Sequence, residues 1–210
     1  MARRTIPVAL GLRVKSGWAA CVVLGGPPDA PRFLGRRLVE LADPKVPRTW
    51  QPYHAGFGTL EKDAAILRRL AGLVQRATQR SLSAVVRDCR ARGQAPRGLG
   101  LVVGSVGDPE RIGNEHIRAH ACEGRLFRTA LERAARRHHL PCRVLLERGL
   151  LATAGRELVI SDQAVRRAAT SLGREAGTPW RSEEKAAAVA AWLILARTPS
   201  ARSSTPRDLL

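Results

Sequence analysis

The chain has 210 residues, of which 44% are hydrophobic and 26% are charged, so it is long and apolar enough to form a folded core. Lysine and arginine number 36 against 18 aspartate and glutamate residues, which gives a formal net charge of +18. This excess favours DNA, RNA or another polyanion as a partner, although an arginine-rich composition can also reflect GC-rich codons. The longest apolar run, residues 186–196, is too short to span a bilayer, so we expect no membrane partner.

The cysteine spacing predicts a reducing, cytoplasmic environment. The four cysteines lie far apart, at Cys21, Cys89, Cys122 and Cys142. Because no two of them form a C-x-x-C pair, the spacing excludes the usual zinc-ribbon sites and indicates free thiols. A basic start followed by apolar residues 6–12 is similar to the beginning of a signal peptide, but Arg13 and Lys15 interrupt the apolar region. We therefore expect no export.

The first part of the chain predicts three strands and a loop. Residues 6–14 and 18–24 are short apolar runs joined around Gly17, which is typical of a β-hairpin with a tight turn. Residues 32–41 predict a third, less buried strand. Residues 44–58 contain several prolines and glycines and predict a long connecting loop.

A long helix is predicted from Thr59, which can cap it, to Gly93, which can end it. Apolar residues at helical spacing predict the buried side of this helix: Leu60, Ala64, Leu67, Leu70, Val74, Ala77, Leu82, Val85 and Cys89. We expect this side to pack on the sheet.

The remaining elements follow from similar patterns. Residues 98–106 are apolar throughout, as in a strand buried on both faces, and Asn114 caps a helix expected to run to about residue 139. One strand and two serine-capped helices follow, at residues 141–146, 161–173 and 182–196. The sequence therefore predicts a single α/β domain over residues 1–197, with the order β-β-β-α-β-α-β-α-α. Residues 198–210 are polar and predict a disordered tail.

This order, with a hairpin strand that contains Gly11-Leu12 and an alanine-rich last helix, resembles the ribonuclease-H-like superfamily. In layout it is most similar to the RuvC Holliday-junction resolvases, over about residues 5–197. The resemblance implies a mixed sheet flanked by helices. The segments HIRAHACEGRLFR and PWRSEEKAAAVAAWL are also similar to parts of bacterial proteins whose function is uncharacterised.

The resemblance also implies where catalytic carboxylates are expected. Nucleases of this superfamily hold two Mg²⁺ ions on a cluster of carboxylates. RuvC-like proteins read Gly-Ile-Asp in the first strand, whereas residues 11–13 read Gly-Leu-Arg here, so Arg13 replaces the first metal ligand. The second carboxylate is expected where residues 104–106 read Gly-Ser-Val, and only Glu184 matches the final acidic residue. We therefore expect no cofactor, and Mg²⁺ only if the chain is still a nuclease.

A second candidate site lies on the helix that follows Asn114. His116, His120 and Glu123 share one face of this helix, on the side turned toward the sheet. They either bond to each other or to the strand at residues 11–13 and complete the core, or line a functional cleft, or bind a transition metal.

Two features could contact nucleic acid. An arginine stripe on the long helix, opposite its apolar side, consists of Arg69, Arg76, Arg80 and Arg87. It either follows a phosphate backbone or forms an ordinary solvated helix face. The proline-rich loop carries Trp50, Tyr53, His54 and Phe57, which either stack on bases or hold the loop against the core.

Taken together, these features favour a catalytically degenerate ribonuclease-H-like domain that binds DNA, RNA or a nucleic-acid-processing partner. One alternative is a divergent metal-dependent nuclease of RuvC-like type, with His120, Glu123 and Glu184 as candidate catalytic residues. The other is a protein-interaction domain with no nucleic-acid role. In the degenerate domain, we expect Arg13 to pair with Glu123 or Glu184 where Mg²⁺ would otherwise hold carboxylates together.

Overall fold

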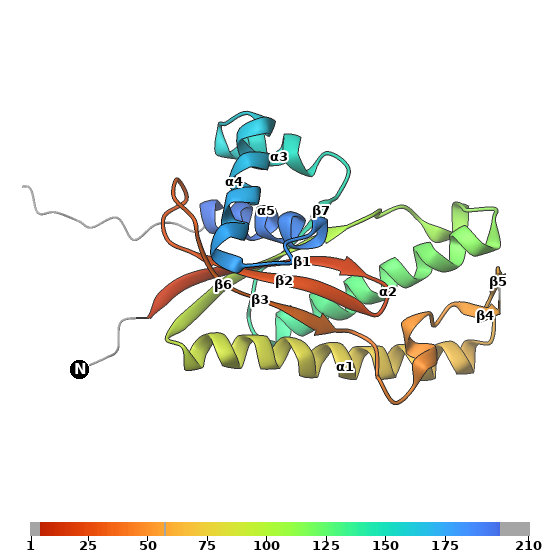
Figure 1. Ribbon diagram of the computed structural model, residues 1–210. Coiled ribbons are helices and arrows are strands. Elements are labelled where there is room, and N and C mark those ends of the chain that lie inside the picture. The colour runs from red at the N-terminus through yellow and green to blue at the C-terminus, as the bar shows by residue number, and fades with distance from the viewer. Residues whose placement is uncertain (1–4, 57, 198–210) are drawn as a thin grey trace, which may run out of the picture.

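Five strands form one mixed sheet with the order β3-β2-β1-β6-β7 (Figure 1). They are β1 (Ile6–Lys15), β2 (Trp18–Gly25), β3 (Arg32–Glu40), β6 (Gln94–Val103) and β7 (Cys142–Leu146). β1 pairs antiparallel with β2 and parallel with β6, so the first apolar run lies at the centre of the sheet, as predicted. The computed structural model describes residues 5–56 and 58–197; Phe57 and the predicted tail at 198–210 lie outside the described residues.

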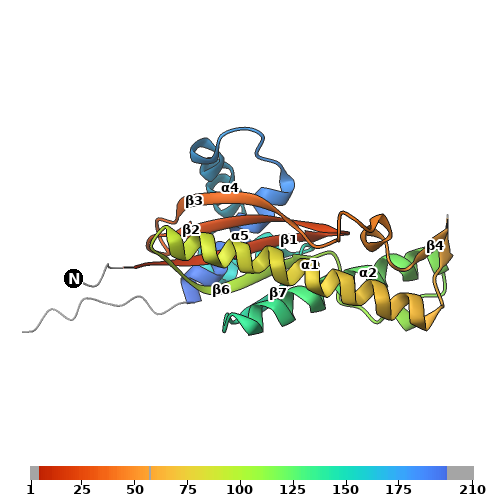
Figure 2. The ribbon, with the colours of Figure 1, turned by 90° about the horizontal axis from the view of Figure 1, so that it is seen from below.

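Helices cover both faces of the sheet (Figures 1 and 2). α1 (Ala64–Ala91) and α2 (Glu115–Arg137) lie on one face, and α5 (Ser182–Arg197) crosses the other, beside α3 (Leu150–Leu158) and α4 (Asp162–Ala176). Successive residues of β1 point to opposite faces, so Leu10 and Leu12 belong to the core under α1 and α2, whereas Ala9 belongs to the core under α5. Burial on both faces explains the continuous apolar character of this strand.

The last helix packs its backbone directly on the two central strands. A Cβ atom built on Gly11 of β1 would lie 1.9 Å from the carbonyl oxygen of Ala187, and one on Gly100 of β6 would lie 2.8 Å from that of Ala190. Only glycine in the strands and small residues in the helix permit this approach. The alanine-rich composition of α5 therefore reflects close helix–sheet packing.

The start of the long helix differs from the prediction. Asp63, not Thr59, caps α1, because its carboxylate accepts hydrogen bonds from the backbone N–H groups of Ala65 and Ile66. Residues 59 and 60 instead form the short strand β5 (Thr59–Leu60), which pairs with β4 (His54–Gly56). Ala64, placed in the predicted core, is exposed at the first turn, while Leu70 and Val74 are buried as expected.

The segment after β7 also contains more structure than predicted. α3 lies between β7 and the two expected helices and begins after Gly149, which has a φ of 83°. Two short 3-10 helices, η1 (Pro47–Trp50) and η2 (Pro109–Arg111), occupy predicted loops. α2 begins after Asn114, whose side chain accepts a hydrogen bond from the N–H of Ile117, as predicted.

The four cysteines are unpaired. Burial raises the pKa of the Cys21 thiol to about 12, and likewise that of Cys142, so both thiols stay protonated near neutral pH. Within residues 5–56 and 58–197, we find no helix whose length and hydropathy would let it cross a membrane.

Candidate functional site

The carboxyl ends of β1, β6 and β7 meet at one corner of the sheet. Because these three strands are parallel, residues near their ends lie side by side, in the place where open α/β sheets bind ligands. Glu147, the first residue after β7, donates its backbone N–H to the carbonyl of Val103 at 2.9 Å. A pocket of about 350 Å³ opens here, and its lining includes Arg13, Ser105 and His120.

A two-pronged ion pair occupies this corner. Nε of Arg13 donates to Oε1 of Glu147 at 2.8 Å, and Nη2 contacts Oε2 of the same carboxylate. Nη1 donates to the carbonyl of Val14. The Arg13 side chain is only 6% exposed, whereas that of Glu147 is 48% exposed. The guanidinium is therefore a buried cation whose charge is balanced by a half-exposed carboxylate.

We expected Arg13 to pair with Glu123 or with Glu184, and both predictions are wrong. Arg13 points to the α5 face of the sheet, whereas Glu123 is buried on the α2 face, so the sheet separates them. Glu184 lies at the start of α5, where it accepts the backbone N–H of Arg181 at 2.9 Å and borders a hollow over β2 and β3. Glu147 therefore takes the place of both.

A second cation of β1 pairs with a second carboxylate. Nζ of Lys15 lies 3.4 Å from Oε1 of Glu183 in the first turn of α5. The pKa of Glu183 is lowered, first by its own backbone N–H at the helix start, then by the Ser182 hydroxyl and by Lys15. Glu147 and Glu183 are thus both neutralised by basic side chains.

The three residues predicted to share one face of α2 differ in burial. Glu123 is completely buried, while His116 and His120 are exposed. Oε1 of Glu123 lies 2.8 Å from Nδ1 of His54, and Oε2 lies 3.5 Å from Nδ1 of His120. Glu123 therefore bonds to the proline-rich loop and not to the strand at residues 11–13. Sequence reasoning placed His54 in that loop but not beside this carboxylate.

The three candidate catalytic residues do not form one set. His120 and Glu123 are neighbours, but Glu184 lies on the other side of the sheet. A nuclease that uses all three together would need them to face one substrate. The arrangement therefore does not support this group as an active site.

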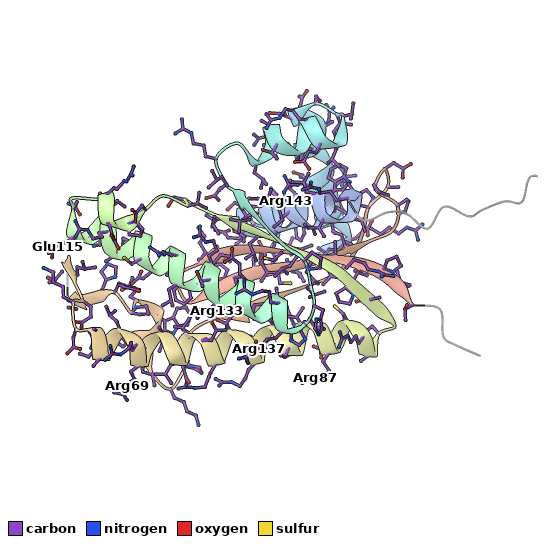
Figure 3. All side chains as sticks on the ribbon, turned by 180° about the vertical axis from the view of Figure 1, so that it is seen from behind. Arg69, Arg87, Glu115, Arg133, Arg137 and Arg143 are labelled. Atoms are coloured by element: carbon purple, nitrogen blue, oxygen red, sulfur yellow. The ribbon has the colours of Figure 1, made fainter. Side chains whose placement is uncertain are left out.

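The arginine stripe lies on the outer side of α1. Arg69, Arg76, Arg80 and Arg87 are all exposed, and Figure 3 shows Arg69 and Arg87 on the side of α1 that faces away from the sheet. Arg80 makes one long ion pair, at 3.7 Å, with Asp43. Exposed Arg133 and Arg137 come from the neighbouring helix α2. The two helices together present a basic surface.

The aromatic loop packs on the first hairpin. A Cβ atom built on Gly17 would lie 2.3 Å from the ring of Trp50, so the ring covers the β1–β2 turn. Burial is the main cause that raises the pKa of the Tyr53 hydroxyl. These contacts fit the structural interpretation of the loop, and Trp50 is also 41% exposed, so base stacking stays open.

Comparison with known proteins supports the fold. No protein-family model and no curated protein matches the chain. RuvC from Thermus thermophilus in complex with a Holliday junction substrate is similar, with a TM-score of 0.53 and 12% identity over 89% of this chain and 90% of that chain. A second structure of Thermus thermophilus RuvC gives a TM-score of 0.50 and 12% identity over 89% and 92%. The chain therefore has the predicted ribonuclease-H-like, RuvC-like fold.

Proposed function

We propose that this chain is a catalytically degenerate ribonuclease-H-like domain that binds nucleic acid, or a partner that processes it, without cutting it. The ion pair between Arg13 and Glu147 carries this proposal. It puts a buried cation at the end of the central strand, where the RuvC resemblance implies a metal-binding carboxylate. The guanidinium holds a carboxylate through two hydrogen bonds, so the corner is stable without a metal.

Charge distribution supports binding to a polyanion. Arg69 and Arg87 are 18 positions apart on α1, or about 27 Å at 1.5 Å per residue. One strand of B-DNA has a phosphate every 3.4 Å, so this length faces about eight phosphates. A solved structure with the same fold is bound to a Holliday junction. The proposal includes the cytoplasmic location expected from the cysteines.

A salt titration tests nucleic-acid binding. Anisotropy of labelled duplex DNA, duplex RNA and a four-way junction is measured between about 50 and 200 mM salt. We expect binding with little sequence preference. Replacing the four stripe arginines by alanine should lower the salt slope by up to about 3.6, because each phosphate contact contributes about 0.9. Over this fourfold salt range, the wild type should then lose about 150-fold more affinity than the variant.

A matched control removes the same charge from the other side of the sheet. The control variant replaces four exposed arginines of α3 and α4 by alanine: Arg156, Arg166, Arg167 and Arg174. It should keep the wild-type slope. If the salt slope falls equally in both variants, net charge and not the stripe drives binding. If neither variant nor the wild type binds at low salt, the protein-interaction alternative replaces the nucleic-acid proposal.

A further inference from the structure

Three histidines meet at one end of the molecule, beyond the ends of the sheet strands. His116 and His120 lie in the first turns of α2, and His54 lies in β4, which packs beside them (Figure 1). One ring nitrogen from each lies within 4.8 Å of the others. Spacing of four residues on a helix puts His116 and His120 on the same side, as in helical pairs that bind zinc.

The distance between two of these nitrogens fits a shared metal ion. Nε2 of His54 lies 3.4 Å from Nδ1 of His116. Two ligands at about 2.05 Å from one tetrahedral zinc ion would lie about 3.3 Å apart. By contrast, 3.4 Å is long for a hydrogen bond between two ring nitrogens. His116 and His120 are exposed, so small rotations of their side chains can bring a ring nitrogen of His120 to the same metal position.

The buried carboxylate of Glu123 prepares His54 as a ligand. A carboxylate only accepts hydrogen bonds, so the 2.8 Å contact puts a proton on Nδ1 of His54, and in the neutral imidazole this leaves the lone pair on Nε2. That lone pair faces His116. Histidines that bind metals commonly donate their other ring N–H to a carboxylate in this way.

Glu123 also has an oxygen that no hydrogen bond satisfies. Its Oε2 atom is buried and has no hydrogen-bond partner among the described residues; Nδ1 of His120 lies 3.5 Å away. A buried anion in this state costs free energy unless a positive charge lies close to it. A divalent cation held by the three imidazoles would supply that charge.

We propose that His54, His116 and His120 bind a divalent transition-metal ion of zinc type, with the carboxylate of Glu123 orienting His54. Three neutral imidazoles suit zinc and similar ions, and do not suit Mg²⁺ or Ca²⁺. Three protein ligands leave one position open, which is the arrangement of exchangeable zinc sites. His54 and His116 also line a pocket of about 530 Å³, so water or a substrate atom can reach that position.

This site shares no residue with the Arg13–Glu147 pair, although His120 lines the same pocket as Arg13, and the inference does not depend on the proposed function. Arg13 and Glu147 lie on the α5 face, whereas Glu123 is buried on the α2 face.

Titration of the untagged full chain with ZnCl₂ tests the proposal. The protein is first treated with EDTA and the chelator is removed. Calorimetry should show one Zn²⁺ per chain and no Mg²⁺ binding. Co²⁺ should give the visible absorption bands of a four-coordinate site, and Zn²⁺ should raise the melting temperature.

The variants separate ligands from structural residues. His116→Ala and His120→Ala change exposed side chains, so both should fold, and each should lose more than the about 10- to 100-fold in zinc affinity that is typical of changing a residue that only orients a ligand. Glu123→Gln should weaken binding about 10- to 100-fold. The matched control is His139→Asn, because His139 is exposed, lies outside the cluster and has a φ of 57°, which asparagine tolerates. Its affinity should equal that of the wild type.

Two results would overturn the proposal. One is absence of stoichiometric Zn²⁺ binding to the folded wild type. The other is unchanged affinity in His116→Ala and His120→Ala, with loss of binding in Cys122→Ser, which would assign the metal to a thiol. Circular dichroism of each variant verifies that it is folded.

Discussion

Removing the carboxylate of Glu147 should destabilise the fold more than removing the guanidinium of Arg13. The two side chains form one ion pair, but Arg13 is 6% exposed and Glu147 is 48% exposed. In Glu147→Gln, a buried cation loses its anionic partner and keeps only neutral acceptors, the carbonyl of Val14 and the oxygen of the side-chain amide at position 147. In Arg13→Met, the remaining glutamate is already half in water and an apolar chain of similar length fills the buried space.

These exposures set the expected magnitudes. Leaving a fully buried charge unpaired costs about 3–5 kcal/mol, and a half-exposed partner reduces this to about 1–3 kcal/mol for Glu147→Gln. Arg13→Met should cost less than about 1 kcal/mol, because apolar replacements of buried ions are often neutral.

Urea unfolding at pH 7 measures both changes, with each free energy of unfolding taken from the midpoint and slope. The control is Asp88→Asn, which breaks the 2.8 Å pair with Arg37, where both side chains are about 40% exposed. It should cost less than about 1 kcal/mol. The reasoning is refuted if Glu147→Gln costs no more than Asp88→Asn, or if Arg13→Met costs more than Glu147→Gln.

Three further changes test other parts of the structure. Gly11→Ala should prevent stable folding, measured by circular dichroism, since its Cβ would overlap the Ala187 carbonyl; a folded variant would contradict the close packing of α5. The side-chain hydrogen bonds of Arg143 lower the pKa of Glu157. This pair therefore stabilises the fold at pH values above the pKa of Glu157 in the unfolded chain, and the contribution is lost as the pH falls through its pKa in the folded chain. Glu157→Gln should flatten the acid side of a curve of stability against pH. Arg13→Asp should create two facing carboxylates, and melting should then depend on Mg²⁺, unlike in the wild type.

Much of the fold was predictable because its signals are local. Apolar runs, Asn114 as a cap and the alanine-rich last helix gave the element order and the central strand. The start of α1 was mispredicted because Thr59 and Asp63 are both good caps and the choice depends on the β4–β5 pairing. The sequence does not predict the short helix α3, because its nine residues form too few helical turns for apolar residues to recur at a clear helical spacing.

The candidate site was less predictable because its contacts are long-range. Arg13 stood out from a resemblance, but its partner is 134 positions away and depends on strand order and register. Glu147 directly follows a predicted strand, so the rule about carboxyl ends of parallel strands could have pointed to it. His54 and Glu123 are 69 positions apart, and no sequence period connects a loop with a helix over that distance.

A cleavage assay tests the central claim most directly. Purified wild-type chain is incubated with a labelled four-way junction, duplex DNA and duplex RNA, with Mg²⁺, with Mn²⁺ or with EDTA, and the products are separated on a denaturing gel. We predict bound but intact nucleic acid under all three conditions. Metal-dependent cleavage that disappears in Glu147→Gln or Glu184→Gln would contradict it and make the chain an active nuclease.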